Sequence, residues 1–329
     1  MTASPLPAPA LAGTGPADPV DTPTAPLPLV LRSERPLDLR STLAKLARGP
    51  YDPTFRVVPS GPQAGTWRTS LFPTGPVTYR LVQAGVRDVV GQAWGPGAGE
   101  LAASLPALLG EPDDAASFAP PARLADAHRR HPGLRVPRTG RVLEALVPAV
   151  LEQKVQTVTA HHAWRWLLAR YGTPAPGPAP DGMRVVPDAR TWATIPTWDW
   201  HRAGVDPRRA RTVVECARVA RRLEECAAMD PTAAQARLQL VPGVGVWTAA
   251  EVGQRALGDA DAVSVGDFHL AKAVGWALTG ERTDDAGMLR LLAPYAPHRY
   301  RVVRLLEVSG LGHAPRRGPR LSIQDHRGN

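Results

Sequence analysis

Residues 238–249 read Leu-Gln-Leu-Val-Pro-Gly-Val-Gly-Val-Trp-Thr-Ala, and the tetrapeptide at 242–245 interrupts a run of helical spacing. Pro242 prevents the preceding helix from continuing, whereas Gly243 and Gly245 permit positive φ angles and close backbone approaches. We expect a second helix from about residue 246, with its free N–H groups beside those of the glycines. Such a group of N–H donors suits a phosphate. A plain turn between two packed helices is the alternative interpretation.

The composition indicates folded domains and a polyanionic partner. The 329 residues are 43% hydrophobic and carry a formal net charge of +9, with a sequence pI near 10.3. This length is enough for two domains, and the basic excess favours nucleic acid, although a GC-rich genome also enriches arginine. The two cysteines, Cys216 and Cys226, share a helical-looking segment and suit a reducing cytoplasm. We expect no membrane span, because no run of eighteen apolar residues occurs.

Composition and periodicity divide the chain into four segments. Residues 1–28 are rich in proline and predict a disordered leader. Residues 29–116 mix β-rich runs, such as the alternation at 77–81, with helical spacing, and predict an α+β domain. Residues 117–313 have helical signals only and predict an all-α domain, in which Asp206-Pro207 and Asp230-Pro231 each begin a helix. Residues 314–329 predict a solvated basic tail.

A single carboxylate, Asp267, stands at the mouth of the next apolar helix, twenty residues after Trp247. Aspartate in this setting is commonly a helix N-cap. A helix N-terminus also keeps a carboxylate ionised, so capping is compatible with a catalytic role.

The hairpin stretch and Asp267 together closely resemble the helix-hairpin-helix DNA glycosylase superfamily. Residues 149–155 are similar to the family's helix end and wedge loop, and residues 293–300 to its late aromatic-Pro-Arg segment. The resemblance covers residues 120–312. The order of an α+β domain before the helices resembles the 3-methyladenine DNA glycosylase II branch and extends the match weakly to residue 30. It implies two helical lobes with the active-site cleft between them.

The resemblance implies a role for individual residues. Asp267 stabilises the oxocarbenium-like charge that develops when the N-glycosidic bond breaks. Flipping the nucleotide requires a wedge and a stacking pocket. The wedge is Gln153 and Lys154, or these residues are simply an exposed helix end; the pocket is Trp247 and Tyr295, or these aromatics belong to the core. The remaining assignments are DNA-backbone contacts at Gly243, Val244, Gly245 and Thr248, and a Na⁺ or K⁺ ion on the main-chain carbonyls of Gln239, Val241 and Val244.

Three features depart from parts of the family. Glu251 stands where the related branch often has an aromatic residue; we hypothesise that it favours a cationic N-alkylated purine, or that it points to solvent. Trp247 occupies the position of the Schiff-base lysine of bifunctional members, so we expect no lyase activity. No cysteine follows Cys226, so we expect no iron–sulfur cluster.

The sequence therefore predicts a monofunctional DNA N-glycosylase of base excision repair acting on alkylated bases of the 3-methyladenine type. The expected partner is double-stranded DNA with damaged bases, and we expect a cytoplasmic, nucleoid-associated monomer that requires no cofactor. The alternative is a non-catalytic DNA-binding protein that keeps the hairpin as a phosphate clip, which would not need Asp267. The arginines that could contact the DNA backbone, or could be plain solvated charges, are Arg208, Arg209, Arg211, Arg299, Arg301 and Arg304.

Overall fold

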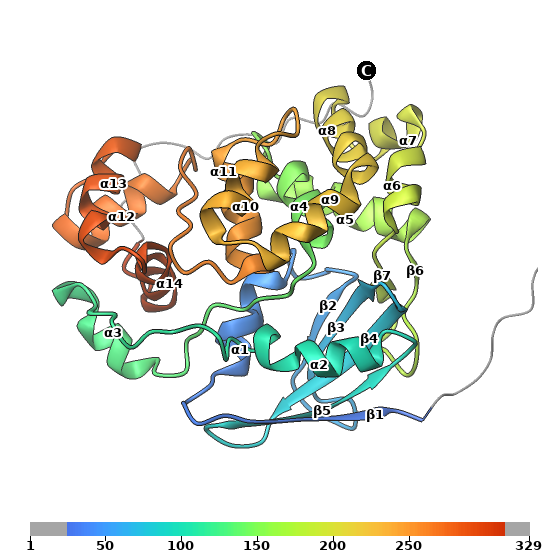
Figure 1. The fold of residues 1–329 in the computed structure, drawn as a ribbon, viewed down its shortest axis with the longest axis horizontal. Coiled ribbons are helices and arrows are strands. Elements are labelled where there is room, and N and C mark those ends of the chain that lie inside the picture. The colour runs from blue at the N-terminus through green and yellow to red at the C-terminus, as the bar shows by residue number, and fades with distance from the viewer. Residues whose placement is uncertain (1–24, 313–329) are drawn as a thin grey trace, which may run out of the picture.

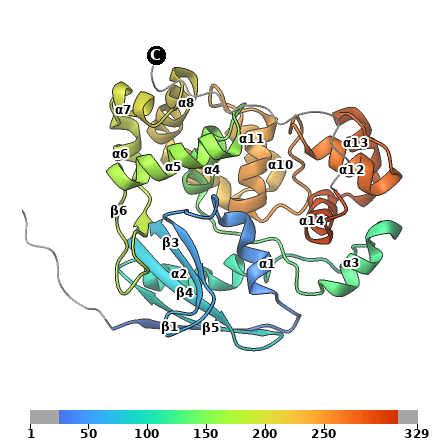
Figure 2. The same cartoon turned by 180° about the vertical axis from the view of Figure 1, so that it is seen from behind.

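The structure is a computed structural model that describes residues 25–312, and its architecture is a five-stranded antiparallel sheet followed by a mainly helical region (Figures 1 and 2). This confirms the predicted fold class. Most of the expected leader and the basic tail lie outside the described residues. Strand β1 begins at Leu27, inside the last part of the expected leader.

The sheet has the strand order β1-β5-β4-β3-β2, and all neighbours are antiparallel. Alternation in β4 buries Val77, Tyr79 and Leu81 on the face covered by the first two helices, as the period of two predicts. The strands are β1 (Leu27–Arg32), β2 (Phe55–Val58), β3 (Gly65–Phe72), β4 (Gly75–Gln83) and β5 (Asp88–Trp94), and the helices are α1 (Leu39–Leu43), with a 3₁₀ turn at Ala44–Leu46, and α2 (Ala98–Leu108).

The other face of the sheet carries a second, smaller cluster. Trp67 and Trp94 stack with ring centroids 5.5 Å apart and pack on Met183. Met183 precedes β7 (Arg184–Val185), which pairs with β6 (Thr173–Pro174). The prediction of helices and loops only beyond the sheet domain was therefore wrong here, because two-residue strands are too short to show alternation.

The first helical lobe surrounds a core in which Trp164, Trp192 and Trp200 stack in sequence. The side chains of Asp206 and Asp230 cap α8 and α10, as the Asp-Pro pairs predict. Helix α5 begins at Thr157, and Gln156 is its N-cap. The helices of this lobe are α4 (Val142–Leu151), α5 (Thr157–Tyr171), α6 (Ala189–Thr194), α7 (Thr197–Arg202), α8 (Pro207–Arg218), α9 (Ala220–Glu224), α10 (Pro231–Leu238) and α11 (Val246–Val252).

The second helical lobe has its own core and joins two distant parts of the sequence. Its helices α12 (Leu270–Thr279), α13 (Asp285–Leu292) and α14 (Arg299–Ser309) pack with α3 (Ala125–Arg130), which precedes the first lobe in the chain (Figure 1). A π-helical turn at Gly253–Leu257 ends the first lobe. None of the helices between residues 25 and 312 combines the length and apolar character that a membrane crossing demands.

Candidate active site

The two glycines of the hairpin between α10 and α11 have different environments. Gly243 has φ +92°, and a Cβ there would lie 2.1 Å from Oγ1 of Thr212 in α8. Gly245 is extended, with φ −100° and ψ −177°, and a Cβ there would meet nothing within 4 Å. Gly243 therefore serves the packing of the lobe, whereas the bare backbone at Gly245 faces open space that another molecule can enter.

The N-terminus of α11 is uncapped by any side chain. Gly245 is the N-cap, and the first helical bond runs from the N–H of Ala249 to the carbonyl of Gly245. The N–H groups of Val246, Trp247 and Thr248 precede that bond, as in any α-helix. Because Val246 is 55% exposed, the start of this helix is accessible. This is the geometry that accepts a phosphate oxygen.

Gln153 fastens the end of α4 to the hairpin. Its Nε2 donates to the carbonyl of Gly243 at 3.0 Å and to Oγ1 of Thr248 at 2.8 Å. Gln153 is half-buried and held by these two bonds, and the Thr248 hydroxyl is engaged by one of them, so a DNA contact of Thr248 would use its N–H; the wedge role of Gln153 stays a prediction. The neighbouring Lys154 is exposed and has φ +54°, so it is the residue at the tip of this turn.

Asp267 lies in the segment that connects the two lobes. Its Oδ1 accepts the N–H groups of His269 and Leu270 at 2.8 and 2.9 Å, so it caps the start of α12. Its Oδ2 lies 3.3 Å from Nε1 of Trp247, which donates to it. The structure thus brings together the two residues that the sequence assigned to the carboxylate and the pocket aromatic. The carboxylate is half-buried and keeps contact with solvent.

Glu251 is buried with both carboxylate oxygens engaged. Oε1 accepts the hydroxyl of Ser264 at 2.6 Å, and Oε2 pairs with Nη1 of Arg255 at 2.7 Å. Burial raises the pKa of Glu251, but Arg255 and Ser264 outweigh burial and hold that pKa below its usual value. The carboxylate is ionised and neutralised within the protein. It does not point to solvent, so that interpretation was wrong, whereas an effect of Glu251 on the choice of base stays a prediction.

The comparisons with known proteins concern the fold and part of the sequence. No family model matches the chain. Over 145 residues, 43% of the chain, it is 36% identical to a probable bifunctional transcriptional activator/DNA repair enzyme AlkA of Mycobacterium tuberculosis, and it covers 28% of that protein's length. A 3-methyladenine DNA-glycosylase from Archaeoglobus fulgidus has the same fold, with a TM-score of 0.68, 17% identity, and coverage of 85% of this chain and 97% of that chain.

The 8-oxoguanine glycosylase/lyase of Clostridium acetobutylicum, in complex with double-stranded DNA containing cytosine opposite 8-oxoguanine, also has this fold. The TM-score is 0.62 at 10% identity, with coverage of 84% of this chain and 96% of that chain. The chain therefore has an AlkA-like fold that it shares with these DNA glycosylases, and over 145 residues its sequence is similar to that of an AlkA-type DNA repair enzyme.

Two further aromatic residues, Tyr295 and Phe268, belong to the second lobe and to the segment that leads into it. Tyr295 is half-buried and packs against the core of α12, α13 and α14. Phe268, which the sequence reading did not single out, directly follows Asp267 and is 65% exposed. Nζ of Lys272 lies 4.1 Å from the centre of its ring. The position of Phe268 directly after the proposed catalytic Asp267 was the sequence signal that could have drawn attention to this aromatic residue.

Most of the arginines proposed as DNA contacts are structural in this glycosylase fold. Arg301 is buried and donates from Nη1 to Asp113 at 3.0 Å, and the buried Arg304 pairs with Glu307. Arg299 pairs with Asp261 at 2.6 Å. The buried Arg209 donates to the carbonyl of Leu151 at 2.6 Å and pairs with Asp206.

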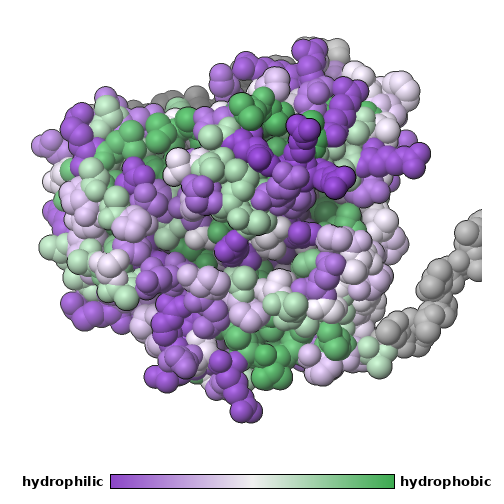
Figure 3. Space-filling model, viewed as in Figure 1, coloured by the Kyte–Doolittle hydropathy of each residue, from purple (hydrophilic) through white to green (hydrophobic). Residues whose placement is uncertain are grey.

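The exposed members of the set are Arg208 and Arg211, on α8. Figure 3 shows hydrophilic side chains gathered on the part of this face where Figure 1 places α8 and α9. This surface continues along the two helices through the exposed Arg218, Arg221 and Arg222.

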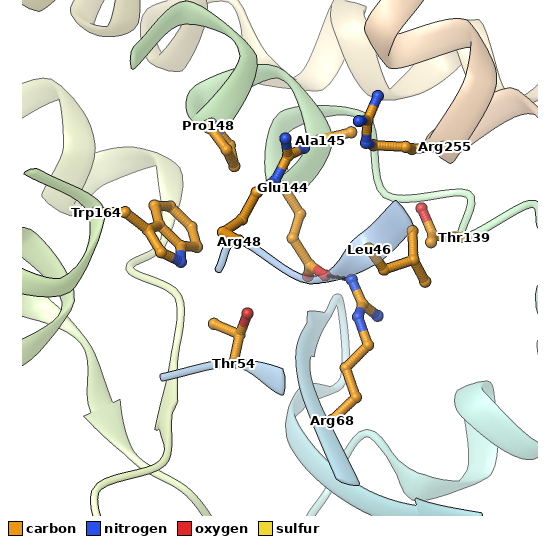
Figure 4. Close-up of a pocket in the computed structure, with 10 residues that line it drawn as sticks. All are labelled: Leu46, Arg48, Thr54, Arg68, Thr139, Glu144, Ala145, Pro148, Trp164 and Arg255. Atoms are coloured by element: carbon orange, nitrogen blue, oxygen red, sulfur yellow. Dashed lines mark hydrogen bonds and ion pairs between the residues drawn. The ribbon is translucent and has the colours of Figure 1, made fainter. Parts of the chain in front are cut away.

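A cavity of about 20 Å³ lies between the sheet domain and the first lobe (Figure 4), and Asp267 is not among the residues that line it. Arg48, Arg68 and Arg255 surround it, and Glu144 pairs with Arg68. Such a volume accommodates about one water molecule. Arg48 also pairs with Glu152 at 3.0 Å, one residue before Gln153. The cavity is therefore part of a charged layer that joins the sheet domain to α4, the turn after it and the π-helical turn that carries Arg255.

Proposed function

We propose that this protein is a monofunctional DNA N-glycosylase that removes alkylated bases of the 3-methyladenine type. The observation that carries the proposal is the contact of Trp247 with Asp267. One helix, α11, offers its open N-terminus to a phosphate and holds the carboxylate through its first turn. Base excision requires a bound DNA strand and, at a fixed distance from it, a negative charge that stabilises the developing positive charge on the sugar.

In this mechanism, the N–H groups at the start of α11 hold a phosphate of the damaged strand. Lys154 enters the space vacated when the nucleotide turns out of the duplex. The electron-rich indole face of Trp247 stacks on the extruded base and attracts the positive charge of an N-alkylated purine. Asp267 stabilises the positive charge that develops on the sugar as the N-glycosidic bond breaks, and orients the water that attacks it.

Lyase activity is not part of the proposal. Trp247 stands where bifunctional members carry the lysine that forms a Schiff base. The nearest lysine in sequence, Lys272, donates from Nζ to the carbonyl of Phe268 at 3.0 Å. Incubation with abasic DNA and borohydride tests this point: we expect no covalent protein–DNA adduct, and a trapped adduct would contradict it.

The proposed partner is double-stranded DNA. We also propose a Na⁺ or K⁺ ion on the carbonyls of Gln239, Val241 and Val244, which bring three neutral oxygen ligands to one turn. The carbonyl of Val241 accepts the N–H of Val244 at 3.0 Å, so the turn is already tightly wound. Among residues 25–312 no group of three or more His, Cys, Asp or Glu side chains could hold a metal ion.

The decisive experiment measures release of free base from methylated duplex DNA by the wild type, Asp267→Asn and Asp230→Asn. Asp230 is a matched control, because it caps α10 in the way that Asp267 caps α12. We expect release by the wild type and by Asp230→Asn, and loss of release with retained DNA binding in Asp267→Asn. Equal release by all three would refute the assignment of Asp267. DNA binding without release by any of them would favour the non-catalytic phosphate clip.

A further inference from the structure

The segment between the π-helical turn and α12 has no regular structure, although it carries Asp267. Its position depends on apolar packing, on backbone bonds such as that from the N–H of Tyr300 to the carbonyl of Ala260, and on side-chain hydrogen bonds. Gln254, in the π-helical turn, donates from Nε2 to the carbonyl of Ala262 at 3.0 Å and to Oγ of Ser264 at 2.8 Å. Gln254 and Ser264 are 3% and 4% exposed, so water does not compete for these bonds.

Glu251 completes this set of bonds from α11. It accepts the Ser264 hydroxyl, and Arg255 holds its other oxygen. Arg255 in turn donates from Nε to the carbonyl of Lys45 in the sheet domain at 2.9 Å. The Glu251 carboxylate, which accepts the Ser264 hydroxyl, is therefore held by its own helix and by Arg255, which is bonded to the sheet domain.

Ser264 is one hydrogen bond away from Asp267. The N–H of Asp267 donates to the carbonyl of Ser264 at 3.2 Å, which closes a tight turn. Trp247, one helical turn before Glu251 on α11, donates to the Asp267 carboxylate. Helix α11 thus contacts both ends of residues 264–267: Glu251 accepts from Ser264, and Trp247 donates to Asp267.

We propose that Glu251 and Ser264 are positioning residues that hold Asp267 at the correct distance from the phosphate grip of α11. The role of the Glu251 charge is to lock the loop, with Arg255 as its counter-ion, and not to select cationic bases. The proposal rests on the proposed glycosylase function, because it assigns Asp267 to the chemistry. A displacement of about 1 Å in such a group can cost a hundredfold in rate.

The test removes the Ser264 hydroxyl and compares the effect with removal of the Ser70 hydroxyl, which has a similar environment elsewhere in the protein. Ser70 also donates to a buried glutamate that pairs with an arginine, at the same distance of 2.6 Å from Glu144, but it lies in the sheet. Rates of base release under single-turnover conditions, the Kd for DNA and Tm are measured for Ser264→Ala, Ser264→Thr and Ser70→Ala. Hydrogen exchange of the amides of residues 264–270 is measured in the same proteins without DNA.

We expect Ser264→Ala to release base about tenfold more slowly with a Kd within about twofold of the wild type. Ser264→Thr, which keeps the hydroxyl, should recover most of that rate, and Ser70→Ala should lower Tm alone. Exchange at residues 264–270 should increase in Ser264→Ala only. Equal rates for Ser264→Ala and Ser70→Ala, or for the alanine and threonine variants, would overturn the positioning role. An inactive wild type would refute the proposed function, whereas unchanged exchange in Ser264→Ala refutes the positioning role by itself.

Discussion

Nε1 of Trp247 lies 3.3 Å from Oδ2 of Asp267, so the first turn of the hairpin's second helix touches the carboxylate that caps α12. Trp247 is on α11 of the first lobe, whereas Asp267 ends the connecting segment and holds the first residues of α12 in the second lobe. A shift of one lobe against the other would separate them. This contact therefore couples the grip on the DNA strand to the position of the reacting group.

Replacing Trp247 with phenylalanine keeps a ring but removes the N–H donor. A hydrogen bond to a charged group contributes about 1.5–3 kcal/mol. We expect base release to slow by about tenfold at the lower end of that range, because the pair is partly solvated. Trp198→Phe is the control, since that indole is 63% exposed on α7. Equal rates for both variants under single-turnover conditions would show that the Trp247 N–H has no role.

The hairpin glycines should respond oppositely to alanine. Gly243→Ala places a methyl group against Thr212 at a φ of +92°, and we expect a loss of about 1–3 kcal/mol in the free energy of unfolding. Gly245→Ala meets no neighbour, so that free energy should change by less than about 0.5 kcal/mol. Its methyl group instead occupies the phosphate site, and the Kd for DNA should rise. Urea denaturation and fluorescence anisotropy measure the two effects; tight binding by Gly245→Ala would contradict the phosphate grip.

Of two adjacent arginines on α8, one should affect DNA binding and the other the stability of the fold. Arg208 is exposed, whereas Arg209 is buried and holds the carbonyl of Leu151. Arg208→Ala should reduce the slope of log Kd against log salt by about 1 without changing stability. Arg209→Ala should cost about 1.5–3 kcal/mol in unfolding free energy. An unchanged salt slope in Arg208→Ala would remove this surface from the DNA-binding face.

Substitutions of Lys154 and Gln153 should change the stability of the fold in opposite directions. Lys154→Gly relieves a left-handed backbone conformation and should stabilise the fold by about 1 kcal/mol. The same change removes the proposed wedge, so release from duplex DNA should fall more than release from single-stranded DNA. Gln153→Ala loses two hydrogen bonds to the hairpin and should destabilise the fold by about 1–2 kcal/mol. Equal losses on both substrates in Lys154→Gly would argue against a wedge.

The two cysteines should be unreactive in the folded protein. Both are buried, and burial raises the pKa of the Cys216 thiol to about 12 and that of Cys226 above its usual value. At pH 8 the thiolate fraction is therefore very small. We expect a thiol reagent to label neither residue before urea unfolds the chain. Rapid labelling of the native protein would indicate local opening of α8 or of the 3₁₀ turn at Glu225–Ala228.

Local patterns were sufficient for many elements of the fold. The alternation of Val77, Tyr79 and Leu81 predicted β4, and the Asp-Pro pairs predicted the starts of α8 and α10. The hairpin was readable because proline and glycine act on their own backbone and need no distant partner. The spacing of Trp247 and Asp267 was informative only through the resemblance to a known family.

Long-range contacts decided the rest, because the role of a charged or polar side chain depends on which partner reaches it. Arg301 looked like a DNA contact until the fold placed Asp113 against it, and only the fold shows that Gln153 donates two hydrogen bonds to the hairpin segment. Glu251 is the clearest case. The sequence by itself determined that a carboxylate follows Trp247 by one helical turn. Only the tertiary structure decided that Arg255 and Ser264 engage it, because a buried charge is costly to leave unpaired and its partner depends on which residues the fold brings to it.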